Sequence, residues 1–229
     1  MNYAIILSGG TGTRLGLNIP KQYYEINGKP IIHYTLETLS HMALLDGYVI
    51  VAAEEWRSYL KKMCGLDEKF LGFAEPGENR QLSIYHGLLA LRKIAAEADV
   101  VLIQDAARPN TTEDMIAECF GLLDKQDGAM PVLPMKDTVY LSENGKQVTS
   151  LLQRNQIFAG QAPESFRYGK YLRANEALLP EKILHINGST EPAILAGMQI
   201  TMITGDEKNY KITTVADLER FCGQIEDKE

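Results

Sequence analysis

An apolar run that ends in a glycine-rich turn, IILSGGTGTRLGLNIPKQ at residues 5–22, constrains the fold of this chain more than any other segment. A short run rich in isoleucine and leucine is typical of a buried β-strand. The glycines after it let the backbone approach a ligand closely and adopt positive φ, and the N–H groups of such a turn bind anions such as phosphate. The sequence therefore predicts a nucleotide-binding loop made of Ser8, Gly9, Gly10, Thr11 and Gly12.

Two cations close to this loop strengthen the prediction. Arg14 and Lys21 add positive charge that a structural turn does not need and a triphosphate does, so we expect both to be catalytic. The sequence lacks the G-x-x-x-x-G-K-[ST] string of P-loop enzymes, and Leu15 stands where a dinucleotide-binding fingerprint has its third glycine. A strand-to-helix turn without a ligand is the simpler alternative, but it leaves the two charges unexplained.

The rest of the chain alternates strand-like and helix-like segments. With 229 residues, 45% of them hydrophobic, it can bury one full core. Apolar runs predict strands at 4–7, 47–53, 100–103, 129–133 and 199–203. Helical spacing predicts helices at 30–40, 80–98, 112–124 and 214–225, with Thr112 and Thr214 as N-caps. We expect one α/β domain over residues 1–229, an open sandwich around a largely parallel sheet with ligands at the carboxyl ends of its strands.

Charge and cysteine content exclude several classes of partner. The formal net charge is −7 and the pI is near 5.2, whereas a nucleic-acid-binding surface needs a basic face. Cys64, Cys119 and Cys222 lie far apart without C-x-x-C spacing, which fits a reducing compartment and indicates neither disulfides nor zinc. The sequence shows no signal peptide and no apolar run of membrane-spanning length. We expect a cytoplasmic protein that binds no nucleic acid and no membrane.

Two further polar strings follow predicted strands. In D-A-A-R-P at 105–109, Asp105 is predicted to ligate Mg²⁺, the usual companion of triphosphates, and the alternative is a helix cap. Arg108 forms either a buried salt bridge or a ligand contact. In the string at 205–213, Asn209 is predicted to supply a second metal oxygen and Lys211 a charge for a substrate phosphate, unless this run is only a solvated loop.

Residues 137–157 have a different pattern. Two alternating stretches flank Asn144-Gly145, which is a strong signal for a β-hairpin. We expect a projecting β-arm whose exposed edges need a partner, the alternative being a solvent-exposed hairpin.

Seven motifs occur in a fixed order over nearly the whole chain. They are S-G-G-x-G-x-R, P-K-Q, G-x-x-R-x-x-S at 77–83, D-A-A-R-P, P-x-x-D-T at 134–138, G-Q-A-P at 160–163 and G-D-x-x-N-x-K. This order resembles the cytidylyltransferases that make CDP-alditols, a family that includes 2-C-methyl-D-erythritol 4-phosphate cytidylyltransferase and ribitol-5-phosphate cytidylyltransferase.

The resemblance implies a fold, a reaction and an assembly. The fold is a three-layer α/β sandwich, the Rossmann-like nucleotidyltransferase fold with a largely parallel sheet and a projecting β-arm. In the reaction, a phosphate oxygen of a small alditol phosphate attacks the α-phosphorus of CTP, and pyrophosphate leaves. In the family the arm swaps across a homodimer and delivers a threonine and an arginine to the neighbour's substrate phosphate, and the matching positions are Thr138 and Arg154.

The motif at 77–83 matches the part of the family that reads cytosine and ribose. By similarity Gly77, Glu78 and Ser83 bind the nucleotide, and Arg80 braces their loop. The plain alternative for Ser83 is an N-cap of the following helix.

The chain departs from the family pattern at one place that bears on the acceptor. Residues 187–192, NGSTEP, stand where methylerythritol enzymes usually show T-D-[DE]-A-S. The double glycine and the G-Q pair before Ala162-Pro163 resemble the ribitol-5-phosphate branch, so ribitol 5-phosphate, a cell-wall or capsule precursor, is favoured as acceptor. The alternatives are 2-C-methyl-D-erythritol 4-phosphate of isoprenoid biosynthesis, a sugar phosphate with another NTP, and a nucleotide sensor without catalysis.

Overall fold

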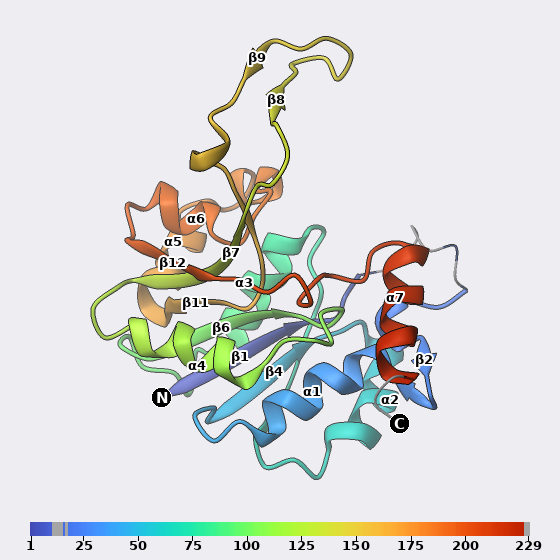
Figure 1. Cartoon of the computed structure of the whole chain (residues 1–229). Helices are drawn as coiled ribbons and strands as arrows, with labels where there is room; N and C mark the ends of the chain where they lie inside the picture. Colours follow the sequence, from blue (N-terminus) through green and yellow to red (C-terminus); the bar gives the residue numbers. More distant parts are fainter. Residues whose placement is uncertain (11–15, 17, 227–229) are drawn as a thin grey trace.

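The computed structural model describes residues 1–10, 16 and 18–226, and its centre is an eight-stranded sheet (Figure 1). In spatial order the strands are β10 (Phe158–Gly160), β7 (Gly128–Pro134), β11 (Glu164–Arg167), β6 (Val100–Asp105), β1 (Asn2–Leu7), β4 (Gly47–Val51) and β5 (Phe70–Ala74), and β12 (Ile200–Thr204) pairs with β7. The pairs among β6, β1, β4 and β5 are parallel, as is the pair of β12 with β7, whereas β11 and β10 run antiparallel to their neighbours. The expected mostly parallel sheet is confirmed.

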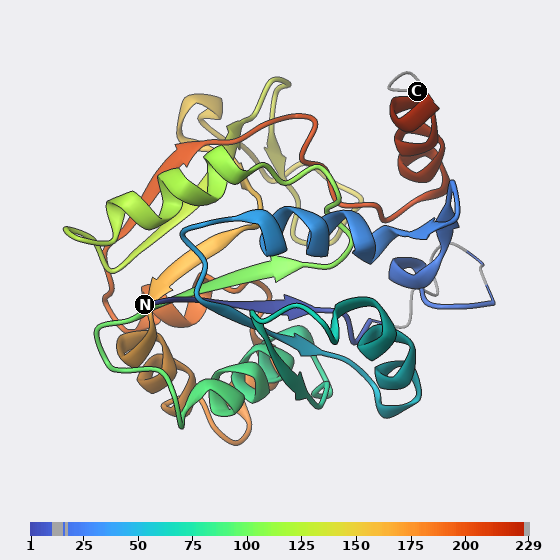
Figure 2. The ribbon, with the colours of Figure 1, turned by 90° about the horizontal axis from the view of Figure 1, so that it is seen from below.

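Helices cover both faces of this sheet. One face packs on α1 (Ile31–His41), α2 (Glu54–Cys64) and α4 (Glu113–Leu122). The other packs on α3 (Arg80–Leu91), α5 (Tyr168–Glu176) and α6 (Glu191–Leu195). Figure 2 shows α1 and α4 on one side of the strands and α3 and α5 on the other. The fold is therefore the three-layer α/β sandwich that the resemblance implied.

The central strands are buried for a simple reason. Strands β1, β4 and β6 have neighbours on both sides and helices on both faces, so nearly every side chain points into a core. All five residues of β4 and all six of β6 are buried. A continuous apolar run is the sequence signature of such a strand, and the five predicted strands are all found within a few residues of their expected ends.

The predicted helix caps are also found. The Thr112 hydroxyl accepts a hydrogen bond from the Met115 N–H at 3.3 Å at the start of α4. At the start of α7 (Val215–Glu226), Thr214 accepts from the Asp217 N–H at 3.2 Å while the Asp217 carboxylate accepts from the Thr214 N–H at 2.8 Å. This reciprocal pair fixes the helix start.

A small third cluster holds α7 against the body. Its core is Ile26, Ile31, Ile212 and Phe221. Ile26 comes from the short hairpin of β2 (Glu25–Ile26) and β3 (Lys29–Pro30), which follows the 3₁₀ helix η2 (Lys21–Tyr23). The cluster therefore ties the segment after the glycine-rich turn to the segment that follows Lys211.

Some elements differ from the sequence prediction. The helix predicted at 80–98 ends at Leu91, because Arg92 and Ile94 form tight i to i−3 bonds and the chain turns toward β6. Helices α2 and α5 and strands β5 (Phe70–Ala74) and β11 were not among the predicted elements. Strand β11 is antiparallel and places the charged Glu164 in the interior, so it does not have the apolar pattern of its parallel neighbours.

The hairpin predicted at 137–157 projects from the body as an arm (Figure 1). Strands β8 (Tyr140–Leu141) and β9 (Ser150–Leu151) pair antiparallel. At its tip Gly145 has φ +67°, and the Asn144 side-chain oxygen accepts from the N–H groups of Lys146 and Gln147. The arm prediction is confirmed, although the ladder is shorter than the alternating pattern suggested.

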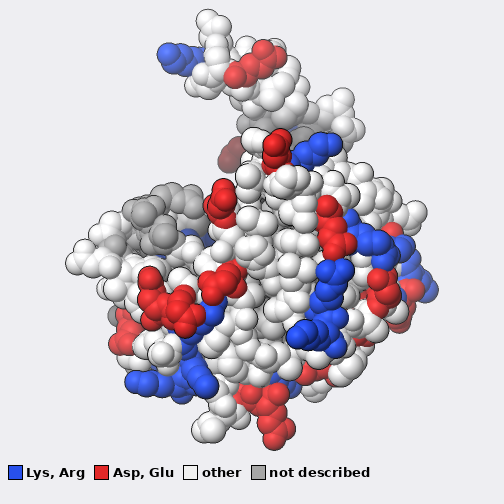
Figure 3. Space-filling view, turned by 180° about the vertical axis from the view of Figure 1, so that it is seen from behind, with Lys and Arg blue, Asp and Glu red and all other residues white. Residues whose placement is uncertain are grey.

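Surface features are consistent with the composition. Side chains of both charges are interspersed over the face shown in Figure 3, and the arm rises beyond it. Cys64, Cys119 and Cys222 are not joined in disulfides. Among the described residues, no helix has both the length and the apolar character needed to cross a bilayer.

Candidate functional site

Loops from the carboxyl ends of the strands surround one pocket of about 500 Å³. Its lining comes from the end of β1, from η2, from the loop before α3, from the end of β6 and from the segment after β12. The residues are Leu7, Gly9, Gly10, Lys21, Gln22, Gly77, Glu78, Asn79, Arg80, Ser83, Asp105, Ala106, Ala107, Lys211 and Thr213. The prediction that the loops after 7, 103 and 203 face one crevice is confirmed. Parallel strands bring their carboxyl ends to one edge, which is why loops so far apart in sequence meet there.

The described part of the glycine-rich loop is held by side chains beneath it. The buried Gln22 amide donates to the carbonyls of Ser8 at 2.6 Å and Gly10 at 2.8 Å. The Ser8 hydroxyl donates to the Tyr23 hydroxyl at 2.9 Å and is buried, so Ser8 supports the loop and does not line the pocket. These two hydrogen bonds anchor the backbone of residues 8–10 at the pocket wall.

Gly9 has a packing role that the sequence did not predict. Neither Gly9 nor Gly10 has positive φ. A Cβ at Gly9 would lie 2.6 Å from the Cβ of Pro76, so close packing of two backbone segments requires glycine there. Thr11, Gly12 and Arg14, which the sequence placed in the same site, lie outside the described residues.

Asp105 is the electrostatic centre of the pocket. Three cations surround its carboxylate: Arg80 Nη2 at 3.2 Å, Lys211 Nζ at 3.1 Å and Arg108 Nε at 3.4 Å. Burial by itself raises the pKa of the Asp105 carboxyl, but these charges outweigh burial and hold the pKa well below its usual value. The carboxylate is therefore ionised at any physiological pH, and the cluster as a whole is positive.

The two arginines of the cluster differ in role. Arg80 lines the pocket, whereas Arg108 does not. Arg108 donates from Nη1 to the Asn209 carbonyl at 2.6 Å and its side chain is mostly buried. Of the two alternatives for Arg108, the structure has the buried salt bridge.

The loop before α3 is built by its own polar side chains. Asn79 is the N-cap of α3, and its oxygen accepts from the Leu82 N–H at 2.8 Å. The Ser83 hydroxyl accepts from the Gly77 N–H and donates to the Asn79 carbonyl, both at 2.9 Å. The capping alternative for Ser83 is therefore wrong. Gly77, Glu78, Arg80 and Ser83 all line the pocket, as the resemblance implied for a nucleotide-binding loop.

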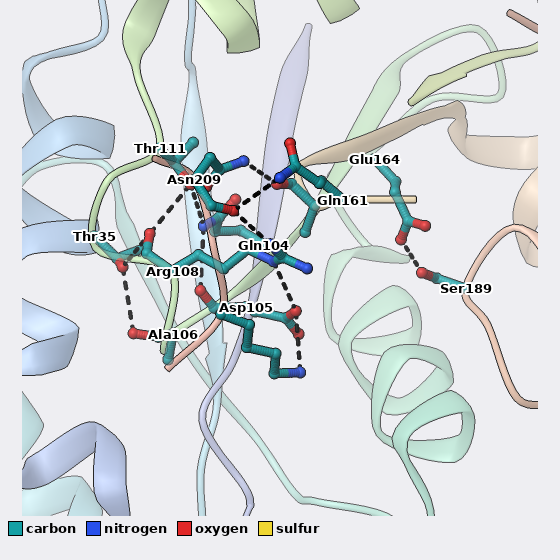
Figure 4. Close-up of polar contacts among 12 residues, drawn as sticks. Thr35, Gln104, Asp105, Ala106, Arg108, Thr111, Gln161, Glu164, Ser189 and Asn209 are labelled. Carbon is teal, nitrogen blue, oxygen red and sulfur yellow. Dashed lines mark hydrogen bonds and ion pairs between the residues drawn. The ribbon is translucent and has the colours of Figure 1, made fainter. Parts of the chain in front are cut away.

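Asn209 lies in a buried polar network beside the pocket (Figure 4). Its side-chain oxygen accepts from the Thr111 hydroxyl at 3.1 Å, and its amide donates to the Ala162 carbonyl at 2.7 Å. Gln104 and Gln161 complete the network, with Gln104 donating to the Thr111 hydroxyl at 2.9 Å. Asn209 is fully buried and is not among the pocket-lining residues, which contradicts the expectation that its oxygen faces a metal. Its role is to fix the loop that carries Lys211.

Thr138 and Arg154 are not brought to this pocket within one chain. Both lie on the arm and are exposed. Arg154 donates from Nη1 to the Lys136 carbonyl at 2.7 Å, across the base of the arm.

Sequence reasoning missed three residues that shape the site. Gln22 had a signal in the P-K-Q motif, but its contact with two carbonyls depends on the fold. Thr213 lines the pocket without any local signal. The carboxylate of Glu164 is buried behind Arg80, 3.9 Å from its Nη2, and nothing near it in the sequence indicates this.

Comparisons with known proteins agree with this geometry. The sequence model of the family described as IspD, 2-C-methyl-D-erythritol 4-phosphate cytidylyltransferase, matches residues 2–222. The 2-C-methyl-D-erythritol 4-phosphate cytidylyltransferase of Geobacter metallireducens is 35% identical, over 94% of this chain and 94% of the relative. The ribitol-5-phosphate cytidylyltransferase of Streptococcus agalactiae is 28% identical, over 100% of this chain and 97% of the relative.

A solved structure has the same fold over almost the full length. The crystal structure of the Francisella tularensis 2-C-methyl-D-erythritol 4-phosphate cytidylyltransferase superimposes with a TM-score of 0.82 at 26% identity, covering 97% of this chain and 99% of that one. The match of the family over residues 2–222 and the 35% identity of a full-length relative leave one conclusion. The chain belongs to the IspD family, the 2-C-methyl-D-erythritol 4-phosphate cytidylyltransferases.

Proposed function

We propose that the protein transfers CMP from CTP to the phosphate of a small alditol phosphate and forms a CDP-alditol and pyrophosphate. The observation that carries the proposal is a pocket lined by three cations, Lys21, Arg80 and Lys211, and by the backbone of Gly9 and Gly10. Arg80 and Lys211 are also paired with the Asp105 carboxylate. The chain as a whole is acidic, with a formal net charge of −7, so a positive pocket at this edge is a local feature that suits phosphates. Membership of the family supports CTP as the nucleotide.

The chemistry needs no covalent nucleophile from the protein. An oxygen of the acceptor phosphate attacks the α-phosphorus of CTP, a new P–O bond forms, and the bond to the β-phosphate oxygen breaks as pyrophosphate leaves. Because the attacking group is already an anion, the protein has to align two anions and offset their charge. We propose that Lys21 and Arg14 bind the triphosphate and that Lys211 binds the acceptor phosphate. Arg80 supplies positive charge beside Asp105.

The donor groups present fit Mg²⁺ held chiefly by the substrate. Among the residues that the structure describes, no group of three or more His, Cys, Asp or Glu side chains is arranged to hold a metal. Two acidic residues, Glu78 and Asp105, line the pocket, and the Asp105 carboxyl is held ionised by the cations around it. Mg²⁺ in triphosphate enzymes commonly takes one or two carboxylates together with substrate phosphates. Bound there, the ion would neutralise phosphate charge that the cations leave uncompensated.

Different observations favour two different acceptor substrates. The family and the 35% identical relative favour 2-C-methyl-D-erythritol 4-phosphate. The double glycine Gly9-Gly10 and the Gly160-Gln161 pair favour ribitol 5-phosphate, and the ribitol-5-phosphate cytidylyltransferase of Streptococcus agalactiae matches this chain over 100% of its length.

We further propose that the active protein is a homodimer joined by the arm. Tyr140, Leu141, Val148 and Leu151 are all exposed on the arm, and such an apolar surface is costly unless a partner covers it. In a two-fold dimer each arm reaches the other chain, which would bring Thr138 and Arg154 to a pocket that they do not reach in their own chain.

The direct test is pyrophosphate release with each of the four NTPs and a panel of polyol and sugar phosphates. We expect turnover with CTP and an alditol phosphate only. Turnover with another NTP and a sugar 1-phosphate would replace the proposal with a sugar nucleotidylyltransferase, and CTP binding without release of pyrophosphate would favour a nucleotide sensor.

A further inference from the structure

A closed ring of contacts connects the pocket to the segment behind it. Arg80 Nη2 lies 3.9 Å from Glu164 Oε2, and the same carboxylate oxygen accepts from the Ser189 hydroxyl. The Ser189 carbonyl accepts from the Tyr171 hydroxyl at 2.6 Å, and that hydroxyl accepts from Gln81 Nε2 at 3.1 Å. Gln81 follows Arg80 in the first turn of α3, which closes the ring. Arg80 is the ring member that lines the pocket.

The interior of this ring excludes water. Glu164 is 7% exposed, Ser189 2%, Gln81 1% and Tyr171 0%. An ionised carboxylate in such surroundings needs donors to replace water. Glu164 has two: the Ser189 hydroxyl at one oxygen and the Thr190 hydroxyl, at 3.1 Å, at the other. Figure 4 shows the Glu164 side chain directed toward Ser189.

Two carboxylates therefore compete for one guanidinium. Arg80 is paired with Asp105, to which it donates from both Nη2 at 3.2 Å and Nε at 3.4 Å. The longer distance of 3.9 Å to Glu164 leaves that second pair incomplete. If Glu164 lost its hydroxyl donors, Arg80 would be the nearest group able to replace them, and a closer pair would draw the guanidinium away from the pocket.

We propose that Ser189 and Thr190 are positioning residues, whose hydroxyls hold the Glu164 carboxylate back so that Arg80 remains beside Asp105 at the nucleotide pocket. The inference rests on the proposed function, in which Arg80 places positive charge where the CTP phosphates bind. It gives a definite role to the S-T pair within the segment at 187–192 that departs from the family pattern.

The test is a rescue experiment at about pH 8, above the usual range for carboxyl groups. Ser189→Ala combined with Thr190→Val should weaken CTP binding, measured by calorimetry without acceptor, and lower kcat/KM by about tenfold, as expected for a displaced charged group. Adding Glu164→Gln removes the carboxylate that captures Arg80. The triple variant should therefore recover to within about threefold of Glu164→Gln alone.

Controls separate this role from packing. Ser165→Ala removes a buried hydroxyl from β11, the strand that also carries Glu164. The Ser165 hydroxyl donates to the Cys119 carbonyl at 3.3 Å, on the opposite face of the sheet. Ser165→Ala should leave CTP binding unchanged, and adding Glu164→Gln to this variant should not strengthen CTP binding. Ser189→Ala alone is a milder variant that should show the same rescue if the double variant does not fold.

The contrary outcomes are distinct. A loss of CTP binding that Glu164→Gln fails to restore, in variants that melt at the parent temperature, would overturn the positioning role. Failure of the parent protein to bind CTP would instead overturn the proposed function.

Discussion

At the scale of single residues, the site is governed by charges placed where water is scarce. Asp105 is 4% exposed and touches three cations, so its carboxylate stays ionised and the cluster keeps a net positive charge. Lys21 lines the same pocket from η2. Such preorganised charges stabilise a transition state without the cost of reorganising solvent.

The first prediction concerns the lysine. Lys21→Ala should lower kcat/KM by on the order of a hundredfold, because charge on the transferring phosphoryl group loses a fixed counter-charge. Arg14→Ala, at the position assigned the same task from sequence, should have a similar effect. The measurement is pyrophosphate release, with Lys62→Ala on the exposed end of α2 as control. Parent-like activity of the Lys21 variant would sink its assignment to the triphosphate.

The second prediction concerns the metal. Asp105→Asn should raise the Mg²⁺ concentration needed for half-maximal activity and lower the maximal rate, because the ion loses its anionic protein ligand. Asp114→Asn, on the first turn of α4, is the matched control. If the Mg²⁺ titration of Asp105→Asn overlays that of the parent, Asp105 does not bind the metal and serves only to hold the three cations in place.

The third prediction concerns Glu164 and pH. Burial raises the pKa of Glu164 from 4.5 to about 7, with Arg80 acting to lower it and Asp105 to raise it. The folded state therefore binds the proton of the Glu164 carboxyl more tightly than the unfolded state does, and protonation of Glu164 stabilises the fold. This stabilisation is complete below about pH 4.5 and is lost as the pH rises through 7.

Urea unfolding of the parent and of Glu164→Gln should therefore diverge with pH. Relative to the variant, the parent should lose on the order of 2–3 kcal/mol of unfolding free energy between pH 5 and pH 7.5. Glu143→Gln on the exposed arm is the control. A constant difference between parent and variant over this range would show that Glu164 does not titrate there.

At the scale of elements, the loops of the pocket are fixed by side chains that bind backbone. Gln22 holds two carbonyls of the first loop, and Ser83 bridges Gly77 and Asn79 in the second. These contacts hold the described backbone at 8–10 and 77–79 in place before a ligand binds, which reduces the entropy cost of association.

The fourth prediction tests the second loop. Ser83→Ala should raise KM for CTP by about fivefold, equivalent to ~1 kcal/mol for one lost hydrogen-bonding group, with a smaller change in KM for the acceptor. Steady-state kinetics with each substrate varied in turn measures both constants, and Ser58→Ala on the exposed side of α2 is the control. Equal changes in the two constants would argue against a loop specific to the nucleotide.

At the scale of the whole molecule, the arm is the feature that one chain leaves unexplained. It carries Tyr140 at 57% exposure and Leu151 at 65%, far from the sheet that organises the rest (Figure 1). In the proposed homodimer a second copy would cover this surface, since a closed two-fold dimer exchanges the same surface both ways.

The fifth prediction tests this exchange by mixing two weakly active variants, Lys21→Ala and Arg154→Ala. If Arg154 acts in the neighbour's site, one site of each mixed dimer collects both lesions and the other collects neither. Random exchange at equal amounts should then restore about a quarter of the parent activity. Arg154→Ala by itself should raise KM for the alditol phosphate more than KM for CTP, because an arginine fork orients a phosphate dianion.

Light scattering of the mixture establishes that dimers form, and labelled subunits establish that they exchange. Exchange without recovery of activity would mean that Arg154 acts within its own chain or only at the surface.

Much of this architecture could be predicted from local pattern. Runs such as 100–103 are apolar because β6 is buried on both faces, and Thr112 and Thr214 cap helices because a hydroxyl there satisfies backbone N–H groups that the helix leaves open. The loops after 7, 103 and 203 could be assigned to one crevice because parallel strands share an edge. These features depend on the spacing of hydrophobic residues along the chain and on contacts between groups that are a few residues apart in sequence.

Contacts between distant segments could not be predicted in the same way. Asn209 has a metal-ligand side chain in a promising string, yet the fold turns it into a buried brace for Thr111 and Ala162. Nothing in the local sequence distinguishes Glu164 from other strand residues. Its buried position follows from the pairing of β11 with β6 and from the contact with Thr190 at the start of α6. The sequence by itself determined the layered fold, the edge of the sheet at which the pocket lies and the family, since these follow from periodicity and short motifs. Only the tertiary structure decided which polar groups face the pocket and which hold its loops in place. That depends on partners far apart in sequence, such as Thr111 and Asn209, which are separated by 98 positions.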